Sequence, residues 1–237
     1  MERPFVPFAP DHLVAIALAF VVPLVLGLVA RASGSRRIAR AFSFALAAEL
    51  IATWILWYWL IAARGWLSSG TVLPMQLCDW AAIASIVALL RSGQRSFELA
   101  YFWAFSGTLQ ALLTPELFYG FPDLRFIVFF AFHDGAIAAP LYLMLAFKRR
   151  PVPASLPRVI AWSFFYLLCA LATNMVFHTN FGYLSAKPAK PSLLDLMGPW
   201  PIYVIACVAL GFGFVLLLYA PFFAADRLRT AGARRTR

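Results

Sequence analysis

Polar side chains that could carry chemistry lie near the ends of four strongly apolar segments. They are Gln76, Cys78, Asp79, Gln110, His133, Asp134, Asn174 and His178. Gln76, Cys78 and Asp79 lie at the start of one segment, and Gln110 lies at the end of the next. His133 and Asp134 lie early in the third segment, and Asn174 and His178 lie at the end of the fourth. Because consecutive membrane spans run in opposite directions, all these positions share one membrane level. Ionisable and amide groups are costly in hydrocarbon, so the shared depth predicts one polar cavity.

Cys78 and His133 are the two groups that predict a reaction. Cysteine attack on an ester requires a thiolate, which a dry site disfavours, so a nearby imidazole must accept the proton and pair with the charge. His178 competes with His133 for the role of base. Asp79 and Asp134 follow the two candidates directly in the chain, and each could orient the reactive residue of the other span.

Three amide side chains are candidate donors to an oxyanion, namely Gln76, Gln110 and Asn174. Backbone or side-chain N–H groups of this kind stabilise the charge that develops on a carbonyl oxygen under attack. No spacing rule chooses among the three.

The depths of Cys78 and His133 permit a contact without requiring one. Cys78 lies about four residues into its span and His133 about nine, so at about 1.5 Å per residue their depths differ by roughly 7 to 8 Å. Helix tilt or a late helix start after Pro74 could close that gap. The alternative is that each polar residue is an interhelical hydrogen-bond partner, worth about 0.6 kcal/mol on average. The histidines, cysteines and carboxylates lack any recognised metal-ligand spacing, so no metal site is predicted.

The elements that must position these residues are membrane-spanning helices. The 237-residue chain has 63% hydrophobic and 13% charged residues and a mean hydropathy of +0.80, far outside the range of a soluble domain. Apolar stretches of the length that crosses a bilayer lie at 13–30, 41–63, 74–90, 97–113, 124–147, 157–178 and 200–224. They show no period-two alternation, which excludes a β-barrel. We therefore expect an all-α, seven-helix bundle, with one transmembrane domain at 1–225 and a basic, disordered tail at 226–237.

The distribution of charge predicts the orientation. Most of the 20 basic residues follow the first, third and fifth spans or lie in the C-terminal tail. The positive-inside rule then places the N-terminus outside, the tail in the cytoplasm and the polar level in the outer half of the bilayer. The net charge of +10 is dispersed among short loops without any recognition element, which argues against nucleic-acid binding. The lysines lie only in loops, which excludes a retinal Schiff base within a span.

Five segments carry a family resemblance. They are Leu-Pro-Met-Gln-Leu-Cys-Asp (73–79), Tyr-Phe-Trp (101–103), Ala-Leu-Leu-Thr-Pro-Glu-Leu (111–117), Phe-His-Asp-Gly (132–135) and Leu-Asp-Leu-Met-Gly-Pro-Trp-Pro-Ile-Tyr (194–203). Over about residues 40 to 220 the chain resembles the bacterial YwaF-type integral membrane proteins. These look related to a eukaryotic transmembrane acyltransferase that moves acyl chains onto lyso-ether phospholipids. The resemblance implies a bacterial inner membrane location and catalytic roles for Cys78 and His133. Gln76 stands where many members are expected to have histidine.

These observations together predict a membrane-embedded phospholipid acyltransferase that works through an acyl-thioester on Cys78. Its partners would be phospholipid and lysophospholipid substrates, and the scheme requires no cofactor. A lipid-ester hydrolase with the same site is one alternative. The other is a non-enzymatic helical bundle that binds or transports lipid in the same polar cavity.

Overall fold

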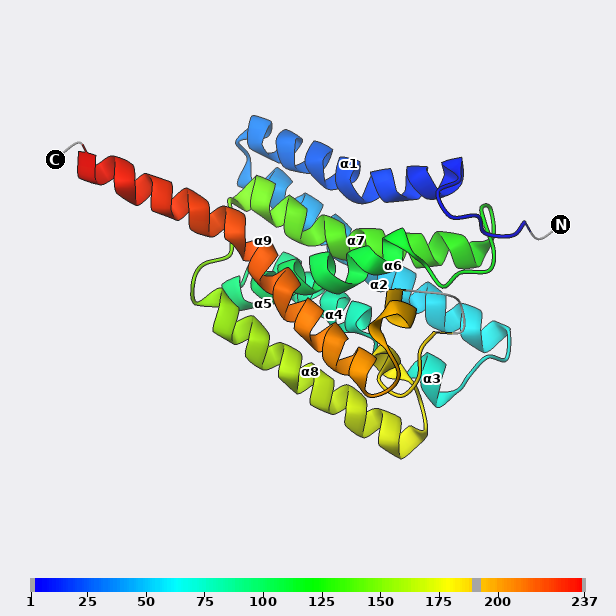
Figure 1. Cartoon of the computed structure of the whole chain (residues 1–237). Coiled ribbons are helices and arrows are strands. Elements are labelled where there is room, and N and C mark those ends of the chain that lie inside the picture. The colour runs from blue at the N-terminus through cyan, green and yellow to red at the C-terminus, as the bar shows by residue number, and fades with distance from the viewer. Residues whose placement is uncertain (1–2, 189–192, 236–237) are drawn as a thin grey trace.

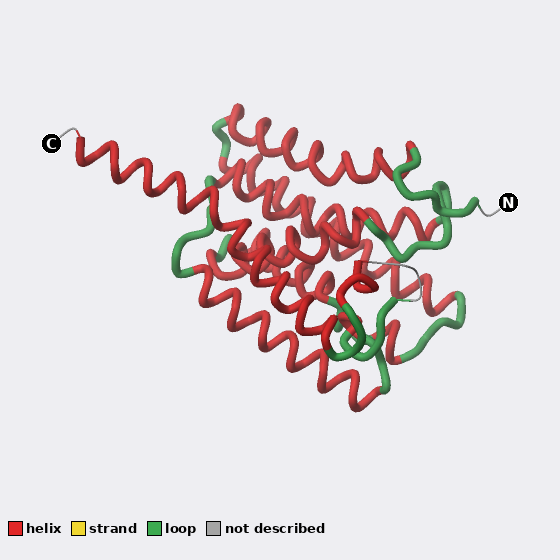
Figure 2. Tube along the Cα trace, in the orientation of Figure 1, coloured by secondary structure: helices red, strands yellow, loops and turns green. Residues whose placement is uncertain are grey.

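The computed structural model describes residues 3–188 and 193–235 and is all-helical, with no strand in those ranges (Figures 1 and 2). The elements in chain order are α1 (Pro10–Ser33), α2 (Arg36–Ala63), α3 (Ser69–Val72), α4 (Leu77–Arg91), α5 (Gln94–Trp103), the π-helical turn η1 (Ala104–Thr108), α6 (Leu109–Leu113), α7 (Leu124–Phe147), α8 (Ser155–Phe177), the 3-10 turns η2 (Phe181–Tyr183) and η3 (Leu193–Met197), and α9 (Ile202–Arg235).

Among the residues that the structure describes, six stretches are long and apolar enough to cross a membrane, which makes this an integral membrane protein. They are Pro10–Ser33, Arg36–Ala63, Ser69–Arg91, Leu124–Phe147, Ser155–Phe177 and Ile202–Leu228. The seventh expected span, 97–113, is helical throughout but is not one of these six. It is assembled from α5, η1 and α6, and its buried residues include Glu98 and Thr108. The helical prediction for this stretch is confirmed, whereas the count of seven spans is not.

Helix α7 is the centre of the bundle. In its most apolar window 61% of the residues are buried, against 17 to 33% for the other five candidate spans. Figure 1 shows α7 running between α1 on one side and α4 and α5 on the other. Small residues allow this close packing. A Cβ added to Gly135 would overlap the Glu49 carboxylate and lie 2.8 Å from Leu50 Cδ2, so α2 can approach α7 only because this residue is glycine.

The surfaces of α8 and α9 that face away from the bundle are apolar. Leu168, Ile205 and Leu217 are each about two-thirds exposed (65%, 66% and 65%). Exposed leucine and isoleucine along α8 and the apolar part of α9 fit contact with lipid chains and not with water. Helix α9 continues to Arg235 and so covers residues 226–235 of the segment for which we predict a basic, disordered tail. Alanine, leucine and arginine are strong helix formers and dominate this segment, which favours continuation of the helix.

The two ends of the bundle differ in character. One end, here called the basic end, holds the turns at 34–35, 92–93 and 148–154 and lies on the left of Figure 1. The opposite end holds the loops at 64–68, 73–76, 114–123 and 178–188. Short hydrogen bonds close that opposite end. His12 Nδ1 accepts from the Phe8 N–H (2.8 Å), so its Nε2 carries the proton and donates to the Leu112 carbonyl (2.8 Å). His12 is thereby a fully bonded structural residue.

Candidate functional site

Cys78 lies in the first turn of a helix that starts inside a membrane span. Helix α3 ends at Val72, Leu73 is extended, and α4 begins at Leu77 after Pro74. Proline lacks a backbone N–H and disfavours helical geometry in the residue before it, which is consistent with the extended Leu73 and the helix break at this point. Asp79 stabilises the new start, because its Oδ2 accepts a hydrogen bond from the Gln76 N–H at 2.9 Å. The broken helix places the thiol beside a helix N-terminus.

The first-turn N–H groups around the thiol are available as donors. The Leu77 N–H donates to no residue within 3–188 or 193–235, and the Cys78 N–H points to its own thiol. The next two N–H groups, of Asp79 and Trp80, both point to the Gln76 carbonyl (3.1 and 3.4 Å). Unpaired N–H groups at a helix N-terminus, together with the helix dipole, favour a negative charge placed there. A thiolate or an oxyanion on an ester bound at Cys78 would occupy that position.

The Thr108 hydroxyl lies beside the Cys78 thiol. Thr108 is fully buried, and its Oγ1 has no hydrogen-bond partner of normal geometry among the described residues. It ends the π-helical turn η1, a kind of local widening that often occurs at functional sites. Gly107 lets this turn approach α4, because a Cβ there would lie 2.6 Å from Leu77 Cδ2. The turn therefore directs an unsatisfied hydroxyl at the first residues of α4.

His133 is in the tautomer that a general base requires. Its Nδ1 lies 2.7 Å from the Phe129 carbonyl, so Nδ1 carries the proton and Nε2 has the free lone pair. The ring stacks on Phe129, with 4.1 Å between the ring centroids, and only 9% of the residue is exposed. Packing and the Nδ1 bond both fix the ring, while Nε2 forms no hydrogen bond to any residue that the structure describes.

A hydrogen bond between α4 and α7 sets the register of the two candidates. Ser85 Oγ donates to the Ala136 carbonyl at 3.2 Å. Cys78 lies about two turns before Ser85 on the same helix face, and His133 lies less than one turn before Ala136. At about 1.5 Å per residue, the thiol is therefore about 6 Å closer to the opposite end than the imidazole. Cys78 and His133 lie on adjacent helices and share no hydrogen bond in the described structure.

A cavity of about 310 Å³ opens at the opposite end, and one of its lining residues, Gln76, lies two positions before Cys78 in the chain. It is lined by Gly70, Gln76, Glu116, Asn180, Phe181, Tyr183, Lys187 and Pro188. The Gln76 side chain accepts a hydrogen bond from the Gly182 N–H at 3.1 Å, which ties η2 to the start of α4. Tyr183 donates to Glu116 Oε2 at 2.6 Å. Burial and the Glu116 carboxylate raise the pKa of Tyr183 above its ordinary value, so the phenol stays protonated.

The partner of Asp134 lies on α2. The Asp134 carboxyl interacts with Glu49 on α2, and a buried oxygen of each carboxyl (Asp134 Oδ1 and Glu49 Oε2) has no hydrogen-bond partner among the described residues. Asp134 is therefore placed beside α2, next to Glu49.

The remaining predicted residues divide between structural and peripheral positions. Asn174 is buried and fully used in binding the loop after α8: its Oδ1 accepts from the Phe181 N–H (2.7 Å) and from Thr179 Oγ1 (2.9 Å), and its Nδ2 donates to the Phe181 carbonyl (3.0 Å). His178 is the exposed residue that ends α8, with a left-handed backbone (φ 52°). The half-buried Gln110 side chain forms no hydrogen bond to the described residues.

The structure thus brings Gln76, Cys78 and Asp79 together with two groups that sequence reasoning missed. These are the Thr108 hydroxyl and the backbone N–H pair of Leu77 and Cys78. The sequence did contain a signal for the first, the small-residue run Ser106-Gly107-Thr108 within an apolar segment, and a signal for the second, the helix-breaking Pro74 just before the cysteine.

Comparison with known proteins gives one positive finding. The family model described as the TMEM164 family matches residues 7–219, most of the chain. No curated protein matches the chain. No solved structure matches it either.

Proposed function

This chain belongs to the TMEM164 family, and we propose that it is a membrane-embedded phospholipid acyltransferase that uses Cys78 and His133. The observation that carries the proposal is the position of Cys78 in the first turn of α4, beside the Leu77 and Cys78 N–H groups and the Thr108 hydroxyl. The narrower resemblance to YwaF-type proteins and to a eukaryotic acyltransferase supports the same two residues.

In the first half of the reaction, the Cys78 sulfur bonds to the ester carbonyl carbon of a phospholipid, and the bond from that carbon to the lysolipid oxygen breaks. The thiol proton passes through a bridging water to His133 Nε2, since the thiol and the imidazole are offset by about 6 Å along the bundle. The imidazolium then protonates the leaving lysolipid oxygen. The products are an acyl-thioester and a lysophospholipid.

In the second half, the hydroxyl of another lysophospholipid gives its proton to His133 Nε2 and its oxygen attacks the thioester carbon. The carbon–sulfur bond breaks, and the Cys78 thiolate recovers the proton. In both halves the carbonyl oxygen becomes negative, and the Leu77 and Cys78 N–H groups and the Thr108 hydroxyl are the donors that would stabilise it. The scheme uses only side chains and lipids, without a soluble cofactor.

The membrane arrangement is part of the same proposal. The helical stretch from Gln94 to Leu113 is about 30 Å long and serves as a seventh span. The basic end faces the cytoplasm and the opposite end faces outward, which follows from the positive-inside rule. Cys78 then serves the outer leaflet of a bacterial inner membrane.

Purified full-length protein tests the proposal with a phospholipid that carries a labelled acyl chain and an unlabelled lysophospholipid acceptor. Cys78→Ala is expected to abolish transfer, and His133→Gln to lower it by about 100-fold or more. Intact-mass spectrometry of the wild type should detect an acyl adduct on Cys78.

Matched controls separate chemistry from folding. Cys169→Ala changes another half-buried cysteine, and His178→Asn changes an exposed histidine; both should keep wild-type activity. Transfer by Cys78→Ala at the wild-type rate would reject the proposal. Release of labelled fatty acid without transfer would identify a hydrolase instead. Lipid binding with neither product would identify a binding or transport protein.

A further inference from the structure

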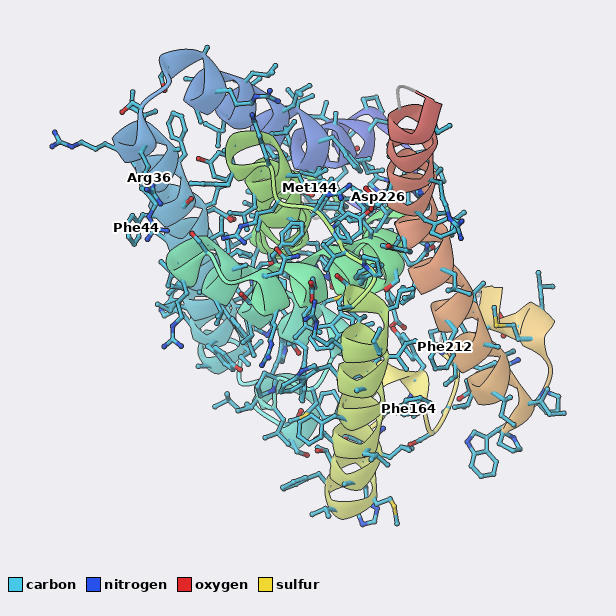
Figure 3. All side chains as sticks on the ribbon, turned by 90° about the vertical axis from the view of Figure 1, so that its left-hand side faces the viewer. Arg36, Phe44, Met144, Phe164, Phe212 and Asp226 are labelled. Carbon is cyan, nitrogen blue, oxygen red and sulfur yellow. The ribbon has the colours of Figure 1, made fainter. Side chains whose placement is uncertain are left out.

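A second cavity lies at the basic end, at the other end of the bundle from Cys78. Its volume is about 490 Å³, and it is lined by Arg36, Arg37, Arg40, Arg91, Ser92, Phe147 and Arg149. These residues come from the start of α2, the end of α4 and the end of α7. Figure 3 views the molecule from this end, with Arg36 on α2 at one side. Three separate helix ends therefore converge on one arginine-lined hollow.

Two of the arginines are held in place by neutral acceptors. Arg40 donates from Nη1 to Ser92 Oγ (2.8 Å) and from Nη2 to the Leu90 carbonyl (2.9 Å). Arg149 donates from Nη2 to the Ser92 carbonyl and from Nη1 to Gln94 Oε1 (3.3 Å). A guanidinium has five N–H donors, so each of these side chains is fixed and keeps donors for another ligand.

The charge of this cavity is uncompensated. Carboxylates at the same end are engaged by other arginines: Glu98 binds Arg158 through two hydrogen bonds (2.9 and 2.7 Å), and Asp226 pairs with Arg150 at 2.7 Å. In Figure 3, Asp226 lies on α9, across the molecule from Arg36. None of the five lining arginines has an ion pair with a carboxylate in the described part of the chain.

The positive-inside rule explains why arginines occur at this end, but it does not require them to share a cavity or two of them to be fixed. Fixed guanidinium groups with spare donors match the geometry of phosphate oxygens, which accept paired hydrogen bonds. Basic pockets between membrane helices at the bilayer surface bind the head groups of anionic lipids. Phe147 in the lining and the Phe44 ring 5.1 Å from the Arg40 guanidinium add apolar surface beside the charges.

We infer that this cavity is a binding site for phosphate groups, supplied by an anionic lipid head group or by a soluble phosphate. The site is independent of the proposed acyltransferase function, because it uses none of the residues near Cys78. It would stand if the catalytic proposal failed.

Native mass spectrometry of the full-length protein in detergent tests the site, with phosphatidylglycerol as the anionic probe and phosphatidylcholine as the zwitterionic reference. The variant is the double substitution Arg36→Gln and Arg91→Gln, since both side chains are exposed and form no hydrogen bond in the described structure. We expect wild type to prefer phosphatidylglycerol and the double variant to bind it about 30-fold more weakly. A matched control, Arg31→Gln with Arg95→Gln, removes the same charge from exposed positions outside the cavity and should bind within about twofold of wild type.

A second arm distinguishes the sources of phosphate. Inorganic pyrophosphate that displaces phosphatidylglycerol and binds alone at similar concentration would assign the site to soluble phosphates. Binding of the lipid without displacement would assign it to the bilayer. Arg40→Lys, which keeps the charge but not the paired donors, should also weaken binding. Wild-type affinity in the Arg36/Arg91 double variant, or an equal loss in the control pair, would overturn the inference.

Discussion

The buried Thr108 hydroxyl lies beside the Cys78 thiol, and this neighbour gives the hydroxyl a possible role. A buried hydroxyl without a hydrogen-bond partner costs about 1–3 kcal/mol, so burial of this group must be offset elsewhere or serve a function. Beside the Cys78 thiol it can donate to a thiolate or to the oxyanion of a bound ester. Stability and activity should then respond to its removal in opposite ways.

Replacing Thr108 by valine tests this directly, because valine has nearly the same shape without the hydroxyl. Acyl transfer should fall by about 100-fold, the usual effect of removing one oxyanion donor, whereas the thermal midpoint should stay the same or rise. Thr108→Ser should retain most activity. Thr173→Val on α8 removes a hydroxyl that binds only the Cys169 carbonyl, and it should leave transfer unchanged. Full activity in Thr108→Val would show that the hydroxyl has no part in the reaction.

The sequence allowed candidate site residues to be chosen by type, but it did not show which groups their side chains contact. Cys78 and His133 could be selected because thiols and imidazoles are rare in apolar segments and have distinctive chemistry. The role of Asn174 could not, since an amide can equally bind an oxyanion or a loop, and only the contacts to Phe181 and Thr179 decide. Thr108 was missed because threonine in a membrane helix normally bonds to its own backbone, and a π-helical turn is not encoded by hydrophobic periodicity.

Close packing between elements depends on single glycines, and α2 against α7 is the clearest case. A methyl group on Gly135 would overlap the Glu49 carboxylate and crowd Leu50, which is buried. Gly135→Ala should therefore lower stability by about 1–3 kcal/mol and separate the two helices. Gly211→Ala is the matched control, because nothing lies within 4 Å of a Cβ there and alanine favours a helix by roughly 0.5–1 kcal/mol. Thermal unfolding in detergent, monitored by tryptophan fluorescence, measures both.

A Gly135→Ala protein as stable as the Gly211→Ala protein would mean that α2 and α7 can move apart at little cost. The close approach of the Glu49 and Asp134 carboxyls would then not be enforced by the packing of α2 against α7.

At the scale of elements, apolar length predicted seven spans, and six of these coincide with the candidate spans, with ends within about five residues of Pro10–Ser33, Arg36–Ala63, Ser69–Arg91, Leu124–Phe147, Ser155–Phe177 and Ile202–Leu228. What it could not resolve were breaks and extensions. The chain leaves helical geometry before Leu77, although the apolar run continues through this point. The stretch from Gln94 to Leu113 is more polar because it is buried among other helices, as the Glu98–Arg158 pair shows. Helix α9 continues beyond its apolar part, since helix propensity does not end where hydrophobicity does.

At the scale of the whole molecule, the two cavities lie at opposite ends of the bundle, so orientation decides which leaflet each one serves. The arginine-lined cavity is formed by α2, α4 and α7 at the basic end. The cavity lined by Gln76 and Tyr183 lies at the opposite end. Arginines resist transfer across the membrane, which favours a cytoplasmic basic end and an outward-facing Cys78.

Cysteine labelling can decide this orientation. The starting protein has Cys78, Cys169 and Cys207 replaced by alanine. Leu67→Cys then marks the loop after α2, and Ala32→Cys marks the last turn of α1. Both positions are exposed, and neither substitution removes a basic residue. A membrane-impermeant maleimide should label the first in intact cells and the second only after permeabilisation. The reverse pattern would place the basic end outside, because the two positions lie at opposite ends of the bundle. The thiol would then face the inner leaflet, and its lipid substrates would come from the cytoplasmic side of the membrane.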